Sequence, residues 1–134
     1  MRWNAGRNGG FSEGEPWLPM GGDVALRNIE TLQSDPHSML WLYRRLIQLR
    51  RAEPALLEGK YEPVRSRNDI LIYKRTHGAD AIVIALNTQH EPRKLEWRGE
   101  GTVLLSSRLD RARQPVQSSV LLRGDEGIIV KLED

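Results

Sequence analysis

Short runs of β-branched and aliphatic residues follow one another from Tyr61 onward, separated by turn residues about every ten positions. Such runs are typical of strands joined by tight turns. They predict seven strands, over residues 61–65, 70–75, 81–87, 93–97, 102–106, 119–122 and 127–132. Segments 76–80 and 124–127 contain glycine and are the predicted hairpin connections. The pattern favours a mainly β fold, an antiparallel Greek-key β-sandwich.

A different period, that of an amphipathic helix, occupies residues 36–52. Asp35 is a suitable N-cap, Pro36 suits the first helical position, and Pro54 follows the last periodic residue. The apolar side chains fall on one half of this helix: Met39, Leu40, Leu42, Tyr43, Leu46, Ile47 and Leu49. Arg50 lies within that half, so we expect either a carboxylate or carbonyl partner for it or a side chain that reaches past the helix end. If nothing covers it, the apolar half would favour self-association.

Residues 1 to 34 contain so many glycines and prolines that we expect a long loop there. A structureless stretch of that length is uncommon inside a compact domain. Several of its residues are large and apolar, which is unusual for a disordered linker: Trp3, Phe11, Trp17, Leu18 and Met20. We therefore expect this segment to pack against a partner that lies outside the chain.

The length and composition of the chain limit the classes of function that it can have. The chain has 134 residues, whereas a complete (β/α)₈ barrel needs about 250. Its 20 Lys and Arg against 18 Asp and Glu leave a net charge of only +2, which is weak evidence for a nucleic-acid partner. The absence of cysteine excludes disulfides and fits a reducing compartment, so we expect a cytoplasmic protein. No apolar run is long enough for a membrane span, although a signal upstream of residue 1 would be invisible.

Residue types that carry chemistry are present but scattered. The three histidines are far apart and at no metal-ligand spacing: His37, His77 and His90. The nearest acidic pairs lie in predicted loops: Glu13 with Glu15, and Asp125 with Glu126. Glycoside hydrolysis needs two carboxyl groups held about 5–9 Å apart on a rigid frame, which such loops do not offer. The sequence therefore predicts no catalytic residue, no cofactor site and no metal site of its own.

Two kinds of binding surface remain as alternatives. Basic residues could form a nucleic-acid surface, namely Arg93, Lys94, Arg98, Arg108, Arg111 and Arg113. Interleaved acidic residues dilute that charge, and no stacking platform of aromatics accompanies it. Four tryptophans suggest sugar stacking, but Trp41 on the helix and Trp97 at a strand end could equally cover a seam between domains.

The order of residues in the first part of the chain resembles the C-terminal end of an α-glucosidase of the α-amylase superfamily, in the branch of oligo-1,6-glucosidases and trehalose synthases. The matching positions are Met1, Trp3, Asn8, Gly10, Phe11, Pro16–Pro19, Asn28, Glu30 and much of 35–56. Arg2 and Asn4 depart from the Gln and Asp that are usual in that family. The likeness is close over residues 1–57 and general over 61–134, where that family has a C-terminal β-sandwich.

This resemblance implies how the chain is organised. Residues 1–57 would be the end of a catalytic barrel, with helix 36–52 as its last helix, and residues 58–134 would be the C-terminal β-sandwich domain. The nucleophile, the acid/base and the stabilising carboxylate of such enzymes all precede the matched motif, so we expect no activity from the chain alone. Met1 coincides with an internal methionine of the motif, which indicates a truncated gene, a misplaced start or an isolated domain.

The resemblance also implies a function. The chain would be the non-catalytic C-terminal portion of an enzyme that hydrolyses α-glucosidic bonds in oligosaccharides, with the missing barrel as its partner. Arg2 and Trp3 would be candidates for the substrate mouth, only with the barrel present. The alternative is a free-standing carbohydrate-binding or protein-interaction module, whose helix must find another partner.

Overall fold

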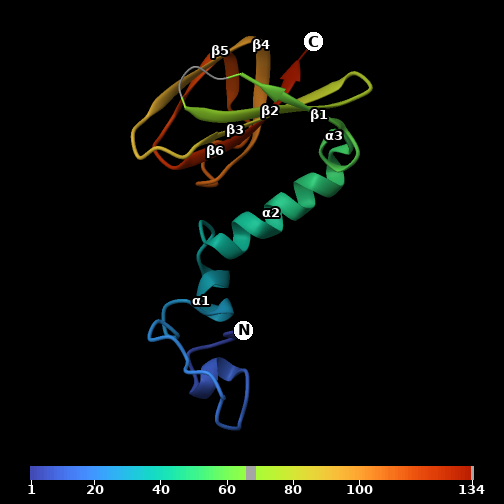
Figure 1. The fold of residues 1–134 in the computed structure, drawn as a ribbon. Helices are drawn as coiled ribbons and strands as arrows, with labels where there is room; N and C mark the ends of the chain where they lie inside the picture. Colours follow the sequence, from blue (N-terminus) through green and yellow to red (C-terminus); the bar gives the residue numbers. More distant parts are fainter. Residues whose placement is uncertain (66–68, 134) are drawn as a thin grey trace. The chain divides into compact units, whose positions relative to one another are not determined.

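The computed structural model describes residues 1–65 and 69–133, without the side chains of residues 97 and 98 (Figure 1). It consists of two compact units, Met1–Arg44 and Arg45–Asp134. The predicted boundary between residues 57 and 58 concerns the division of a longer enzyme and remains a prediction.

A curled, antiparallel six-stranded sheet makes up most of the second unit (Figure 1). Its strands are β1 (Lys60–Val64), β2 (Ile70–His77), β3 (Asp80–Asn87), β4 (Arg93–Ser106), β5 (Pro115–Leu122) and β6 (Glu126–Glu133). The spatial order is β1-β2-β3-β6-β4-β5. Strand β6 thus lies between β3 and β4, so the β3–β4 and β5–β6 connections each pass over a neighbouring strand. The predicted mainly β class is confirmed.

Two of the seven predicted strands form a single strand in the structure. Residues 93–97 and 102–106 both belong to β4, which is continuous but shifts its register against β5 between Glu96 and Glu100. Gly99 has a φ of 107° at this irregularity. The glycines that interrupted the hydrophobic pattern therefore bend a long strand through a bulge instead of ending it.

Successive residues of each strand point to opposite sides of the sheet, and both sides are apolar. The inner face, enclosed by the curl, is formed by Ile70, Ile72, Val83, Ala85, Leu95, Val103, Val116, Val120, Leu122, Ile128 and Val130. The outer face holds Ile82 and Ile84 with the partly buried Tyr73, Leu86, Leu104 and Ile129. Strand β3 is apolar on both sides because it contributes to both faces, as its continuous run of residues 82–86 predicts.

The helices are α1 (Ile29–Ser34), α2 (Met39–Ala52) and α3 (Pro54–Leu57), preceded by a short 3₁₀ turn, η1 (Arg7–Gly10). The expectation of loop throughout residues 1–34 is wrong at α1, which the Asn28 side chain caps by accepting from the Thr31 amide at 2.9 Å. Among the described residues, no helix is long and apolar enough to cross a membrane.

The predicted helix of residues 36–52 begins later than expected. Asp35 accepts from the amide of His37 through its side chain and from that of Ser38 through its carbonyl, so residues 36 and 37 form a turn ahead of Met39. Pro54 follows the periodic residues of α2 and is also the first residue of α3, a position that proline favours. Arg50 is exposed, so its charge is not buried within the apolar half of the helix.

Candidate functional site

The predicted substrate-mouth residues, Arg2 and Trp3, lie in an extended segment that is tied to α1 through its backbone. The amide of Ile29 donates to the carbonyl of Arg2 at 3.0 Å, and that of Glu30 donates to the carbonyl of Trp3 at 3.0 Å. With the Asn28 cap on Thr31, three of the amides at the start of α1 have partners. The segment is therefore placed by a helix end and not by its own regular structure.

Asn28 is the residue that holds this arrangement together. It is 2% exposed, and besides capping α1 its Nδ2 donates to the carbonyl of Val24 at 2.8 Å and to that of Ala25 at 3.3 Å. One buried amide group thus fixes both the helix and the turn before it, because all of its polar atoms are used. This gives a physical reason for an asparagine at the matched Asn28 position.

A left-handed turn fixes the other side of the segment. Asn8, Gly9 and Gly10 have φ values of 52°, 62° and 67°, and the carbonyl of Gly9 accepts from the amides of Trp3 at 2.6 Å and Asn4 at 3.2 Å. Gly9 is buried, and a Cβ there would lie 3.3 Å from the Cα of Arg2. Only glycine combines this conformation with such close approach of two backbones.

The guanidinium of Arg2 is engaged within the same unit. It is paired with the carboxylate of Asp23, which also lies 3.4 Å from Nε of Arg27. The hydrogen bond from Arg2 lowers the pKa of Asp23 below its usual value. Arg2 is therefore held in place and charge-compensated, whereas the side chain of Trp3 remains about half exposed. A hollow of about 690 Å³ lies beside the turn, lined by Arg7, Gly10, Phe11, Ser12 and Glu13.

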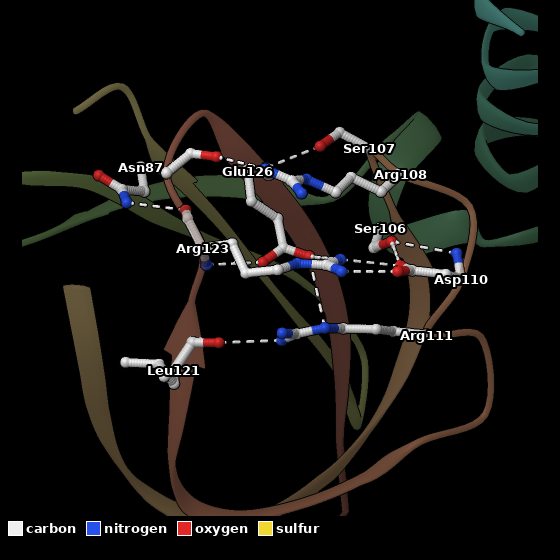
Figure 2. A network of polar contacts seen from close by, with 11 residues as sticks. Asn87, Ser106, Ser107, Arg108, Asp110, Arg111, Leu121, Arg123 and Glu126 are labelled. Carbon is white, nitrogen blue, oxygen red and sulfur yellow. Dashed lines mark hydrogen bonds and ion pairs between the residues drawn. The ribbon is translucent and has the colours of Figure 1, made fainter. Parts of the chain in front are cut away.

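A second polar cluster lies in the sheet unit (Figure 2). Glu126 has no exposure to solvent, and it accepts from the guanidinium of Arg123 at 2.5 Å and from the amide of Arg123 at 2.8 Å. Asp110 accepts from the same guanidinium at 2.7 and 2.8 Å and from the Ser106 hydroxyl at 2.9 Å. Arg111 lies 3.4 Å from Glu126 and donates to the carbonyl of Leu121 at 2.9 Å.

The charges of this Arg123 cluster stabilise one another. The hydrogen bond from Arg123 holds the pKa of Asp110 far below its usual range, and the hydrogen bonds to Asp110 and Glu126 raise the pKa of Arg123. Burial opposes ionisation of Glu126, but the hydrogen bonds from Arg123 and the charges of Arg111 and Arg123 outweigh it and lower its pKa. With two carboxylates fully engaged by two guanidiniums, the cluster locks strands together and offers neither a free acid nor a free base.

Asp125 and Glu126 were predicted to lie in one loop, and the structure separates their side chains. Glu126 belongs to the buried cluster, while Asp125 lies 2.7 Å from Nδ1 of the exposed His90. That hydrogen bond raises the pKa of His90. The burial of Glu126 gave no signal in the sequence, because it depends on Asp110 and Arg111, which come from another part of the chain, lying beside Arg123.

The basic residues weighed as a nucleic-acid surface are largely used within the molecule. Arg108 donates to the carbonyl of Gly124 at 2.9 Å, Arg93 lies 3.2 Å from Glu91, and Lys94 lies 2.8 Å from Glu96. The side chains of Arg98 and Trp97 lie outside the described part of the chain. These pairs leave a mixed surface, which does not favour phosphate binding.

Of the tryptophans weighed for sugar stacking, Trp41 is tied to its own unit. Its Nε1 donates to the carbonyl of Gln33 at 3.1 Å, and the guanidinium of Arg44 lies 5.1 Å from the centre of its ring. Trp17 is 91% exposed.

Comparison with known proteins shows that the chain is similar to glycoside hydrolases. Residues 1–59 match the Alpha-amylase family, described as alpha amylase, catalytic domain. The chain is 31% identical to trehalose-6-phosphate hydrolase of Bacillus subtilis (strain 168), over 98% of its own length and 24% of that protein. It is 36% identical to a probable alpha-glucosidase of Rhizobium meliloti (strain 1021), over 68% of the chain and 16% of that protein.

The fold agrees with these similarities. The crystal structure of trehalulose synthase from Pseudomonas mesoacidophila MX-45 matches with a TM-score of 0.88 and 28% identity, over 98% of this chain and 24% of that one. The chain thus spans about a quarter or less of the length of each of these relatives.

Proposed function

Because the chain belongs to the α-amylase superfamily, we propose that it is the non-catalytic C-terminal portion of one of its α-glucosidases. Its role is to stabilise a (β/α)₈ barrel that carries the catalytic carboxylates. The activity of the whole enzyme is the hydrolysis of α-glucosidic bonds in oligosaccharides. Residues 1–57 complete the barrel, and residues 58–134 form a domain attached to it.

The single observation that carries this proposal is the uncovered apolar side of α2. Within this helix of 14 residues none is buried, and Met39, Tyr43 and Ile47 are 61%, 61% and 50% exposed. Their spacing of four places them along one side of the helix. A stripe of large apolar side chains on a helix normally packs against another element, since burying each contributes about 1.5–3 kcal/mol. The outer helices of a barrel bury such stripes against its strands.

Arg2 and Trp3 belong to this proposal as residues near the substrate mouth once the barrel is present. Support comes from their fixed placement, because the carbonyls of both residues accept from amides at the start of α1 and the amide of Trp3 also donates to the carbonyl of Gly9. Trp3 offers an exposed aromatic face, which suits the apolar face of a sugar ring, and Arg2 is held by Asp23. Sites of this kind need side chains whose positions are fixed before the ligand arrives.

A chimera tests the proposal. The C-terminal quarter of Bacillus subtilis trehalose-6-phosphate hydrolase is replaced by residues 1–134, and hydrolysis of trehalose 6-phosphate is measured. We expect the chimera to hydrolyse the substrate, the enzyme without any C-terminal part to be inactive, and the isolated chain to show no turnover. An inactive, unfolded chimera would contradict the proposed role, as would turnover of a nitrophenyl α-glucoside by the highly purified chain alone.

A free-standing carbohydrate-binding module is the second candidate function, favoured by the almost complete exposure of Trp17. Aromatic platforms of this kind can stack on pyranose rings. Isothermal titration of the isolated chain with maltose and isomaltose separates the two candidates. Saturable binding that Trp17→Ala abolishes would support the module, and the structural role predicts no binding.

A further inference from the structure

Asn8 and Gly9 form the pair of neighbours in which asparagine is chemically least stable. The backbone nitrogen of the residue after an asparagine can attack the side-chain carbonyl carbon, and glycine hinders that attack least because it has no Cβ. Asn8 is the one asparagine of this sequence that precedes a glycine. Its side chain is therefore the one most prone to lose its amide group once nothing restrains it.

The folded backbone keeps the side chain of Asn8 away from the nitrogen of Gly9. Asn8 has a φ of 52° and a ψ of 28°. At that ψ, the Asn8 nitrogen lies within 28° of eclipsing the Gly9 nitrogen about the Cα–C bond, so Cβ points to the opposite side. The attack closes a five-membered ring through Cβ and Cγ, which requires Cβ on the same side as the Gly9 nitrogen. The ring can therefore form only after the turn opens and ψ rotates.

Hydrogen bonds also hold both reacting groups. The amide of Gly9, a buried residue, donates to the carbonyl of Gly6 at 3.0 Å. Nδ2 of Asn8 donates to the carbonyls of Ser12 at 3.0 Å and Gly14 at 2.7 Å. The attack needs the Gly9 nitrogen to lose its proton to a base in water, and it needs Nδ2 to leave as ammonia. Both changes break these bonds, so the folded turn protects a pair that is labile in the open chain.

We propose that Asn8 is a site of spontaneous deamidation, which the folded Gly9 turn protects and which each opening of the turn exposes to reaction. In the open turn a bond forms between the Gly9 nitrogen and Cγ of Asn8, and the bond from Cγ to Nδ2 breaks. The proton lost from the Gly9 nitrogen leaves with Nδ2 as ammonia. Water then opens the resulting succinimide ring. Cleavage of the new bond leaves an aspartate at residue 8, and cleavage of the original peptide bond leaves an isoaspartate.

Either product prevents the turn from forming again as it was. A carboxylate has no hydrogen to donate, so its oxygen would face the carbonyl oxygens of Ser12 and Gly14, to which Nδ2 had donated. Isoaspartate also adds one carbon to the main chain, in a turn where a Cβ on Gly9 would already lie 3.3 Å from the Cα of Arg2. The carbonyl of Gly9 holds the amide of Trp3 at 2.6 Å, so the reaction releases that segment permanently.

Deamidation is measured at residue 8 of the full chain, in buffer and in concentrated urea at the same mildly alkaline pH. Mass spectrometry follows the peptide that carries this residue, and chromatography separates aspartate from isoaspartate. Gly10→Ala opens the turn and leaves the reacting pair intact, because Gly10 has a φ of 67° and a Cβ there would lie 2.6 Å from the side chain of Asn4. Gly22→Ala is the matched control, since a Cβ there meets nothing within 4 Å. Hydrogen exchange at the amide of Trp3 reports whether the turn is formed in each chain before incubation.

In urea, the three chains should convert at the same rate, since all of them carry Asn8 before Gly9. In buffer, the parent and Gly22→Ala should convert at least about tenfold more slowly than in urea, because only molecules with an open turn react. Gly10→Ala should lose most of that protection and exchange faster at Trp3. Equal rates for the parent in buffer and in urea would overturn the proposal, as would the absence of conversion in urea. Conversion of Gly10→Ala as slow as that of the parent in buffer would also overturn it.

Discussion

The carboxylate of Glu126 is enclosed by Arg123, which donates to it through both its guanidinium, at 2.5 Å, and its own backbone amide, at 2.8 Å. The relationship joins the end of β5 to the start of β6 at a point with no exposure to solvent. Because a buried charge pair is costly to break from one side, this contact decides how well the sheet tolerates substitution there.

Replacing Glu126 with alanine should lower the free energy of unfolding by about 3–5 kcal/mol, because Arg123 and Arg111 lose a buried counter-charge. Urea denaturation followed by circular dichroism of the sheet measures the change. Glu96→Ala is the control, since that residue pairs with Lys94 at 2.8 Å but is 69% exposed at its side chain, and its stability should stay close to that of the parent. Equal losses in the two variants would contradict the special role of Glu126.

Acid should destabilise the sheet through the same cluster. The pKa values of Asp110 and Glu126 are lower in the folded chain than in the unfolded one, so their contribution is present above the unfolded values, about 4, and is lost as the pH falls below them. We expect the urea concentration at the unfolding midpoint to decrease as the pH is lowered from about 5 to about 2, the range over which these carboxylates become protonated. The double variant Asp110→Asn and Glu126→Gln should be less stable at pH 7 and show a flatter dependence. An unchanged slope in that variant would assign acid sensitivity elsewhere.

The Gly9 turn should be sensitive to substitution. Gly9→Ala places a side chain at φ 62° and within 3.3 Å of the Cα of Arg2, which should destabilise the local structure by about 1–2 kcal/mol. Faster hydrogen exchange at the amides of Ile29 and Glu30, which bind the carbonyls of Arg2 and Trp3, reports the loss. Gly22→Ala is the control, because a Cβ there meets nothing within 4 Å. Equal exchange in both variants would show that the turn does not support the segment.

A charge on the apolar side of α2 should lower stability only in the whole enzyme. In the isolated chain, Ile47→Lys should change stability by less than about 0.5 kcal/mol, because Ile47 is half exposed there. It should also reduce self-association, measured by analytical ultracentrifugation. In the chimera the same change should lower thermal stability, since a charge is then buried against the barrel. Gln48→Lys, one position further around the helix, should leave the chimera unaffected, and an equal effect of both would argue against a specific apolar contact.

Local chemistry explains which features the sequence predicts. Strands follow from alternation, and the β2–β3 hairpin follows from the turn residues of segment 76–80. The predicted hairpin at segment 124–127 is wrong, because β4 lies between β5 and β6 in the sheet, and a local turn signal does not say which strands pair. The break at residues 98–101 was misread because glycine marks a bulge as readily as a turn. Helix α1 could have been found from Asn28, a good N-cap, but the glycines and prolines before it concealed the signal.

The parts that depend on distant residues were not predictable from pattern. Glu126 lies in a polar turn sequence, and only the arrival of Asp110 and Arg111 beside Arg123 makes it a buried group. Likewise, Arg2 and Trp3 could be matched to a family motif, whereas their binding to the start of α1 requires contacts across more than twenty residues. Such contacts follow from tertiary packing, which local propensity does not encode.

We propose that this chain acts as one part of a longer α-glucosidase. The most direct test is the mass of the native gene product, determined by mass spectrometry of cell extract with peptides of this chain as the handle. The account predicts a product about four times the length of the chain, as the 24% coverage of the relatives implies, with barrel peptides upstream of residue 1. A product consisting of these 134 residues alone would contradict it.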